Sequence, residues 1–142
     1  MRDHGILDGK QGRTEIKFTV SHTDESDYTH DGLRAFFEYR DLGIKEATAG
    51  QFNAHVIRAR PGEKTPGEWH RHDLDFQMVY VLRGWVRFEY EGIGEVLLRP
   101  GSCVHQPAGI QHREIEHSDD LEMLEITSPA EFGTEAAEGS GS

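Results

Sequence analysis

The feature that most restricts the fold of this chain is a series of short runs of β-branched and aromatic residues, separated by glycine and proline. Such runs, with turn residues at short intervals and no long helical periodicity, are typical of antiparallel sheets that form a sandwich or a barrel. One patch, residues 32–40, is ambiguous because its apolar spacing also fits a helix. We therefore expect an all-β, antiparallel fold, with strands at 33–39, 52–59, 76–82, 85–90, 95–98, 103–106, 113–116 and 121–126.

Composition divides the chain into three parts. Residues 1–32 are polar, with one short strand expected at 16–20, and residues 33–134 carry the strand pattern of the expected barrel. Residues 135–142 are small and polar, a composition that cannot bury enough apolar surface to order itself. We expect one domain with an N-terminal arm and a disordered C-terminal tail.

Gly84 separates two expected strands and predicts a central hairpin between them. Alternation places Gln77, Val79 and Val81 on one face of the first strand, while its other face is equally apolar. A strand that is apolar on both faces should be covered on both. Either the N-terminal arm or a second subunit provides the second cover, and our hypothesis is a homodimer.

The overall charge excludes some classes of partner. The chain has 15 Lys and Arg against 26 Asp and Glu, a formal net charge of -11, which repels phosphate backbones and anionic membrane surfaces. No apolar run reaches the roughly 18 residues that a membrane-spanning helix needs. We therefore expect a small-molecule ligand, with no nucleic acid and no membrane as partners.

Cysteine content and the first residues bear on the compartment. Cys103 is the only cysteine, so no intrachain disulfide can form. The opening residues lack the apolar core of a secretory signal. We expect a cytoplasmic protein.

Two histidines and a glutamine in the segment 67–84 predict part of a metal site. His70 and His72 are two residues apart, so both imidazoles point to the same face of an extended chain. Turn-forming residues then separate His72 from Gln77, so the chain can reverse and bring Gln77 opposite the pair. Gln77 is thus a third candidate ligand, on a neighbouring strand.

A fourth candidate ligand follows a rigid turn. Pro107, Ala108 and Gly109 form a turn that aims His112 back into the barrel. Three imidazoles and one amide oxygen would then converge on one divalent metal ion. The alternative is that these are unrelated polar side chains.

These residues follow two spaced motifs of the cupin superfamily. His70, His72, Gln77 and Gly84 match the pattern H-x-H, three or four residues, an acidic position, six residues and glycine. The later pattern G-x5-P-x-G-x2-H is matched in full, by Gly101, Pro107, Gly109 and His112. The chain resembles a small single-domain cupin. The resemblance implies a double-stranded β-helix, or jelly-roll barrel, that binds a metal.

Three positions depart from the cupin pattern. Gln77 replaces the usual Glu, Glu116 stands where Asn is often found, and no glycine lies five residues before His70. A neutral amide leaves the charge of the ion uncompensated, which should attract an anionic substrate or enolate and weaken metal retention. The amide NH₂ would remain a donor near a metal-bound ligand, so Gln77 is also a candidate catalytic residue.

Two further histidines are candidate proton carriers. His55 lies on an expected strand, where it either faces the cavity or packs against the N-terminal arm. His105 alternates with Cys103 on one face of the strand before the Pro107 turn, which could place both in the pocket. For Cys103 the alternative is an ordinary small core residue.

Function is less constrained than fold, because cupins serve many functions. Our leading hypothesis is a non-haem iron oxygenase that acts on a small oxygen-bearing organic molecule. Alternatives are a redox-free lyase or isomerase, with the metal as Lewis acid and His105 or His55 as base, and a non-catalytic binding protein. Family analogy favours Fe(II), while Mn, Ni, Cu and Zn also suit the predicted ligands.

Overall fold

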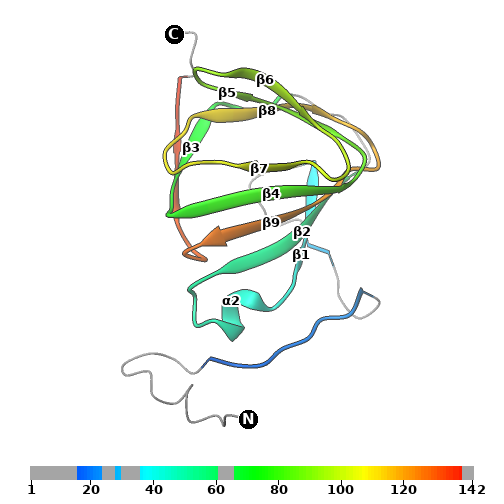
Figure 1. The fold of residues 1–142 in the computed structure, drawn as a ribbon, viewed down its shortest axis with the longest axis vertical. Helices are drawn as coiled ribbons and strands as arrows, with labels where there is room; N and C mark the ends of the chain where they lie inside the picture. Colours follow the sequence, from blue (N-terminus) through cyan, green and yellow to red (C-terminus); the bar gives the residue numbers. More distant parts are fainter. Residues whose placement is uncertain (1–15, 24–27, 30–35, 61–65, 139–142) are drawn as a thin grey trace.

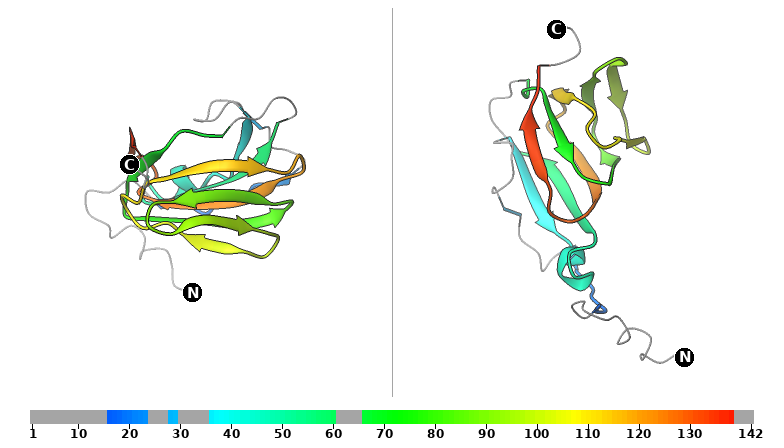
Figure 2. Two further views of the ribbon diagram at one scale, coloured as in Figure 1. Left: turned by 90° about the horizontal axis from the view of Figure 1, so that it is seen from above. Right: turned by 90° about the vertical axis from the view of Figure 1, so that its left-hand side faces the viewer.

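Two five-stranded antiparallel sheets face each other in the computed structural model, which describes residues 16–23, 28–29, 36–60 and 66–138 (Figures 1 and 2). This arrangement confirms the expected jelly-roll fold. One sheet has the order β1 (Phe37–Asp41), β2 (Asn53–Ala59), β9 (Glu122–Ser128), β4 (Phe76–Arg83) and β7 (Cys103–His105). The other has the order β10 (Gly133–Ala136), β3 (His70–Asp73), β8 (His112–His117), β5 (Val86–Tyr90) and β6 (Gly94–Leu98).

A short helix and an extended segment lie at one edge of the barrel. Helix α2 (Ile44–Ala47) connects β1 to β2, and Figure 1 shows it beside the extended segment 16–23. The segment 16–20 is not a strand as the sequence predicted, although the Lys17 amide donates to the Ala47 carbonyl over 2.9 Å. Its residues have strand-forming side chains but no ladder with the sheet. No helix in the described part of the chain is long and apolar enough to cross a membrane.

Three other expectations from the sequence can be compared with the structure. The ambiguous patch 32–40 is a strand from Phe37 onward, and its first residues lie outside the described part. The prediction of a disordered tail from Glu135 onward is wrong at its start, because Glu135 and Ala136 belong to β10 and pair with β3. Of the arm expected at 1–32, only residues 16–23 and 28–29 are described.

Gly84 connects two sheets and does not form the predicted hairpin. β4 pairs with β7 and β9, whereas β5 pairs with β6 and β8. Gly84 has φ +71°, and a Cβ there would lie 2.8 Å from Leu121 Cα. Since that contact is with backbone, a larger residue would displace the chain at this crossing.

Strand alternation sends one face of each strand into the barrel. Val79 and Val81, which share a face of β4 as the sequence predicted, are buried, and so are Val86 and Phe88 of β5. Burial of each such side chain contributes about 1.5–3 kcal/mol. The core cluster comprises Phe37, Ile57, Val79, Val81, Val86, Phe88, Tyr90, Leu98, Leu121 and Met123.

The two ends of the barrel interior differ in polarity. Near Gly84 the interior is apolar, and we call this the apolar end, formed by Val81, Val86, Leu98 and Leu121. Register places Gln77 opposite Thr127 and His70 opposite His112 at the other end of the same strands. We call this the polar end, formed by His70, His72, Gln77 and His112, all at most 8% exposed.

Candidate metal centre

Three histidines from two adjacent strands meet at the polar end. His70 and His72 alternate along β3, and His70 is the cross-strand partner of His112 on β8. One ring nitrogen from each residue lies within 4.8 Å of the others, and the ring centroids are 4.4–5.1 Å apart. The predicted convergence of the three imidazoles is therefore present, and the group can hold a metal ion.

Hydrogen bonds at Nδ1 orient these imidazoles for metal binding. Nδ1 of His70 lies 2.8 Å from the Glu68 carbonyl, and Nδ1 of His112 lies 3.0 Å from the Ile110 carbonyl. A carbonyl only accepts, so Nδ1 carries the proton in both rings and the lone pair lies on Nε2. Nδ1 of His72 bonds to the Thr134 hydroxyl at 2.9 Å. This donor set fits a divalent transition metal.

Gln77 lies in the same cavity but is held by a carboxylate. Its side chain is 4% exposed, and Nε2 donates to Glu125 Oε2 over 2.6 Å. A carboxylate only accepts, so the NH₂ group faces Glu125 and the amide oxygen points away from it. One of the two hydrogens of this predicted donor group is therefore already engaged by Glu125.

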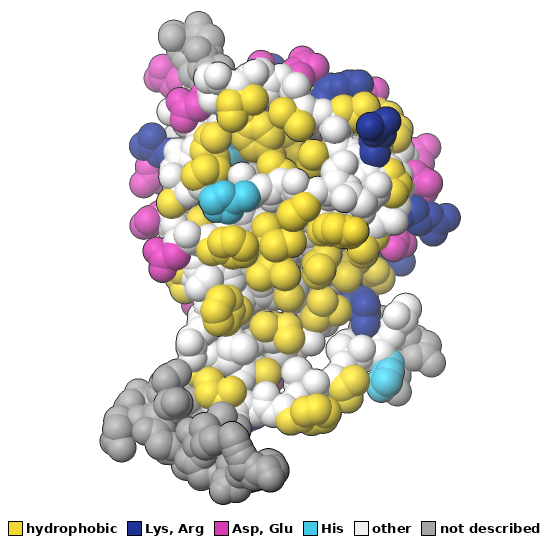
Figure 3. Space-filling model, in the orientation of Figure 1, with side chains coloured by type: hydrophobic (Ala, Val, Ile, Leu, Met, Phe, Trp, Pro, Cys, Tyr) yellow, Lys and Arg dark blue, Asp and Glu magenta, His cyan; other side chains and the backbone are white. Residues whose placement is uncertain are grey.

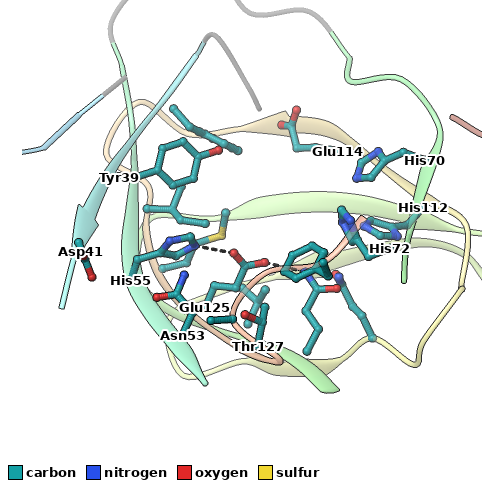
Figure 4. A pocket seen from close by; sticks show the side chains of 18 of the residues that line it. Tyr39, Asp41, Asn53, His55, His70, His72, His112, Glu114, Glu125 and Thr127 are labelled. Atoms are coloured by element: carbon teal, nitrogen blue, oxygen red, sulfur yellow. Dashed lines mark hydrogen bonds and ion pairs between the residues drawn. The ribbon is translucent and has the colours of Figure 1, made fainter. Parts of the chain in front are cut away.

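Glu125 joins Gln77 to His55. His55 on β2 is the direct cross-strand partner of Glu125 on β9, and His55 Nε2 lies 2.6 Å from Glu125 Oε1 (Figure 4). Burial raises the pKa of Glu125, but the hydrogen bonds from His55 and Gln77 oppose this effect, and the pKa lies below its ordinary value. A negative charge is thus available one hydrogen bond away from Gln77.

Sequence reasoning missed Glu125, although a signal was present. Alternation along β9 places Met123, Glu125 and Thr127 on one face, and Met123 and Thr127 are buried. An acidic residue at the inward position of an apolar strand is unusual without a partner. That pattern marks Glu125 as a residue of the site.

One cavity of about 860 Å³ contains both groups. His55, Glu125, Gln77 and the three histidines all line it, and Figure 4 shows His55 and Glu125 on one side and the histidines on the other. Part of the cavity wall is apolar. It includes Phe37, Ile57, Val79, Phe88 and Met123.

His105 lies outside this cavity, contrary to the predicted pocket position. Its strand β7 turns Val104 toward the core, whereas His105 and Cys103 are exposed. The His105 ring stacks on Phe76 with centroids 5.6 Å apart. Alternation therefore puts both His105 and Cys103 on the outer face, and neither is a pocket residue.

A buried hydrogen bond supports the wall next to the histidines. Tyr90 donates its hydroxyl to Gln106 Oε1 over 2.6 Å, and burial raises the pKa of Tyr90 well above its ordinary value. The Tyr90 ring lies 5.8 Å from His112. Tyr90 therefore acts as a neutral donor that packs beside the metal ligand.

Comparison with known proteins identifies the family. A model of the cupin domain matches residues 55–127, more than half of the chain. The chain belongs to the cupin family. The comparison with curated proteins found no match.

Solved cupin structures share the fold at low sequence identity. KdgF from Halomonas sp. is 22% identical with a TM-score of 0.63, covering 78% of this chain and 94% of that chain. The polyketide cyclase RemF from Streptomyces resistomycificus is 17% identical with a TM-score of 0.70, covering 87% and 89%. A sugar phosphate isomerase from Silicibacter pomeroyi is 21% identical with a TM-score of 0.62, covering 78% and 74%.

Proposed function

We propose that this cupin is a metal-dependent enzyme that transfers a proton on a small oxygen-bearing molecule without a redox change, as a lyase, isomerase or cyclase does. The observation that carries the proposal is the hydrogen-bonded chain from His55 through Glu125 to Gln77, in the cavity that also holds the three histidines. A metal site next to a carboxylate–imidazole pair combines Lewis-acid and base chemistry.

The metal would be held by His70, His72 and His112, with the amide oxygen of Gln77 as fourth ligand. When bound, the ion supplies a Lewis acid for a carbonyl or enolate oxygen. Glu125 fixes which atom of the Gln77 amide faces the histidines and brings a carboxylate close to the ion. The charge that Gln77 lacks is therefore partly restored one hydrogen bond away.

His55 would be the base. The Glu125 carboxylate only accepts, so Nε2 of His55 carries the hydrogen-bonded proton, and Nδ1 is the nitrogen that would take up a proton from the substrate. Glu125 then stabilises the imidazolium. The apolar part of the wall would limit water around the substrate, which would strengthen these interactions.

The test is isotope exchange without oxygen. Metal-loaded protein in D₂O under argon is incubated with β-hydroxycarbonyl and 1,3-dicarbonyl compounds and followed by NMR. We expect deuterium incorporation or loss of water that requires the metal and disappears in His55→Gln. Equal exchange with metal-free protein would exclude the proposal, and saturable binding without exchange would indicate a non-catalytic binding protein.

A second candidate is the iron oxygenase. It is favoured by the neutral donor set, three imidazoles and an amide oxygen, which suits Fe(II), and by the apolar part of the cavity wall. Oxygen consumption that depends on Fe(II) and on one of the same compounds would support it. Turnover under argon would exclude it for that compound.

We also propose a homodimer that forms through the outer face of β4. Phe76, Tyr80 and Leu82 are 36–47% exposed there, and Figure 3 shows hydrophobic side chains gathered over this face with charged groups toward its margin. Two copies with a net charge of -11 repel one another, so a face without charges is where they can approach. Light scattering tests this proposal.

A further inference from the structure

Glu114 is a buried carboxylate that the proposed reaction does not use. It lies on β8, is 1% exposed and lines the cavity. Oε2 accepts a hydrogen bond from Nδ1 of His117 at 2.8 Å, and the rings of Phe36 and Phe37 pack against His117 with centroids 5.4 and 5.0 Å away. Oε2 of Glu114 is therefore held by His117, whose ring packs against two apolar side chains.

The other oxygen of Glu114 has no partner. Oε1 is fully buried and makes no hydrogen bond with any group in the described part of the chain. Buried carboxylate oxygens are normally satisfied, because leaving one without a donor is costly. The pairing of Oε2 alone points to a ligand group as the partner of Oε1.

Strand geometry gives the distance from the metal ligands. Glu114 follows His112 by two residues on the same inward face, which corresponds to about 6.6 Å along the strand. Its cross-strand partner Phe88 lies in the cavity wall beside it. In Figure 4 Glu114 lies on the side of His70, well away from His55 and Glu125.

We propose that Glu114 determines specificity by binding a hydrogen-bond donor of the substrate, either a hydroxyl or an ammonium group. About the length of an arylalkyl group would separate this donor from the substrate oxygen that binds at the three histidines. The inference rests on the proposed function, because it assumes that substrate oxygen binds at the metal centre. It selects neutral or cationic molecules with an apolar body between two polar ends. It rejects molecules with a carboxylate or phosphate at the Glu114 end, because like charges would face each other there.

The test uses three catechols that chelate a metal in the same way and differ at the remote end. Dopamine carries an ammonium group, 4-ethylcatechol carries none, and 3,4-dihydroxyphenylacetate carries a carboxylate. Calorimetric titration of the zinc-loaded protein measures their affinities without any redox reaction. We expect dopamine to bind about tenfold more tightly than 4-ethylcatechol, and the carboxylate to bind most weakly.

Glu114→Gln should remove most of the difference among the three affinities, and Glu116→Gln is the matched control. Gln keeps the shape and an acceptor for His117, while Glu116 lies on the same strand with an exposed side chain paired to Arg87. Should Glu114→Gln fail to fold, the order of the three affinities in the unaltered protein still decides. Metal-dependent binding without that order, or an order unchanged in Glu114→Gln, would overturn this inference and leave the proposed function standing. If none of the catechols binds in a zinc-dependent way, both fail.

Discussion

The two ends of the barrel interior share several strands but differ in polarity and in the role that their side chains have. At the apolar end, Val81 and Val86 are completely buried in the hydrophobic core cluster. At the polar end, the same β4 strand buries Gln77, and its neighbours bury histidines. Buried polar groups stabilise a fold poorly, because their hydrogen bonds replace those they made with water. Fold stability therefore comes from the apolar end, and the polar end is available for ligand chemistry.

The largest expected effect is loss of metal from the polar end. His70→Ala, His72→Ala or His112→Ala should reduce bound metal to near zero, because each removes one of three imidazoles that no neighbouring group replaces. Elemental analysis measures this loss. His105→Ala, on the outer face, should keep the metal, and equal loss in that control would contradict the assigned ligands.

Next in size is the effect on catalysis of breaking the hydrogen-bonded chain. Glu125→Gln should lower the exchange rate by about 10²–10⁴-fold while metal content is kept, because the charge that stabilises the His55 imidazolium is removed. The isotope-exchange assay measures the rate. The matched control is Glu122→Gln on the same strand, which should leave the rate unchanged. A metal-bound Glu125→Gln variant with full activity would remove Glu125 from the mechanism.

Changes at the apolar end should act on stability alone. Leu121→Ala should lower the free energy of unfolding by about 2–5 kcal/mol, because Leu121 is 1% exposed and its removal leaves a cavity. Urea titration measures the loss, with the half-exposed Leu97 changed to Ala as control. Metal content should be unchanged in both variants. A large loss of metal in Leu121→Ala would show that the two ends are coupled.

The smallest expected effect concerns the outer face of β4. Tyr80→Glu should convert the proposed dimer to a monomer in light scattering, with metal content and exchange rate close to the unaltered protein, because Tyr80 does not line the cavity. Tyr80→Phe serves as control and should remain dimeric. An unaltered protein that is already monomeric would end the dimer proposal.

The sequence predicted those parts that depend on local alternation. Gln77, Val79 and Val81 share a face as expected, and the structure shows that this face is the inward one; His70 and His72 converge as their two-residue spacing implied. What it did not predict depends on pairing between distant segments. β10 contains small and polar residues and becomes a strand only because it pairs with β3, more than 60 residues earlier, as in the pairing of Thr134 with His72.

Glu125 shows the same limit at the level of the site. Its strand was expected, but its partners His55 and Gln77 lie on two other strands, and only the register brings the three together. The prediction for the segment 16–20 was wrong for the opposite reason, because its side chains favour a strand but no ladder forms there. Pairing partners, rather than local propensity, decided both cases.

The attachment of β3 has a consequence for how an ion enters and leaves. β3 carries two of the three histidines, yet its ladder with β8 consists of the single pair His70 and His112. Local opening of this seam should therefore cost less free energy than opening of the longer β4–β9 ladder. A bound ion would crosslink the two strands, so amide protons at the β3–β8 seam should exchange with solvent quickly in the metal-free protein and slowly in the loaded one, whereas those in the longer β3–β10 ladder should differ less. The seam is thus where we expect an ion to enter, and the part of the barrel that a bound ion should stabilise most.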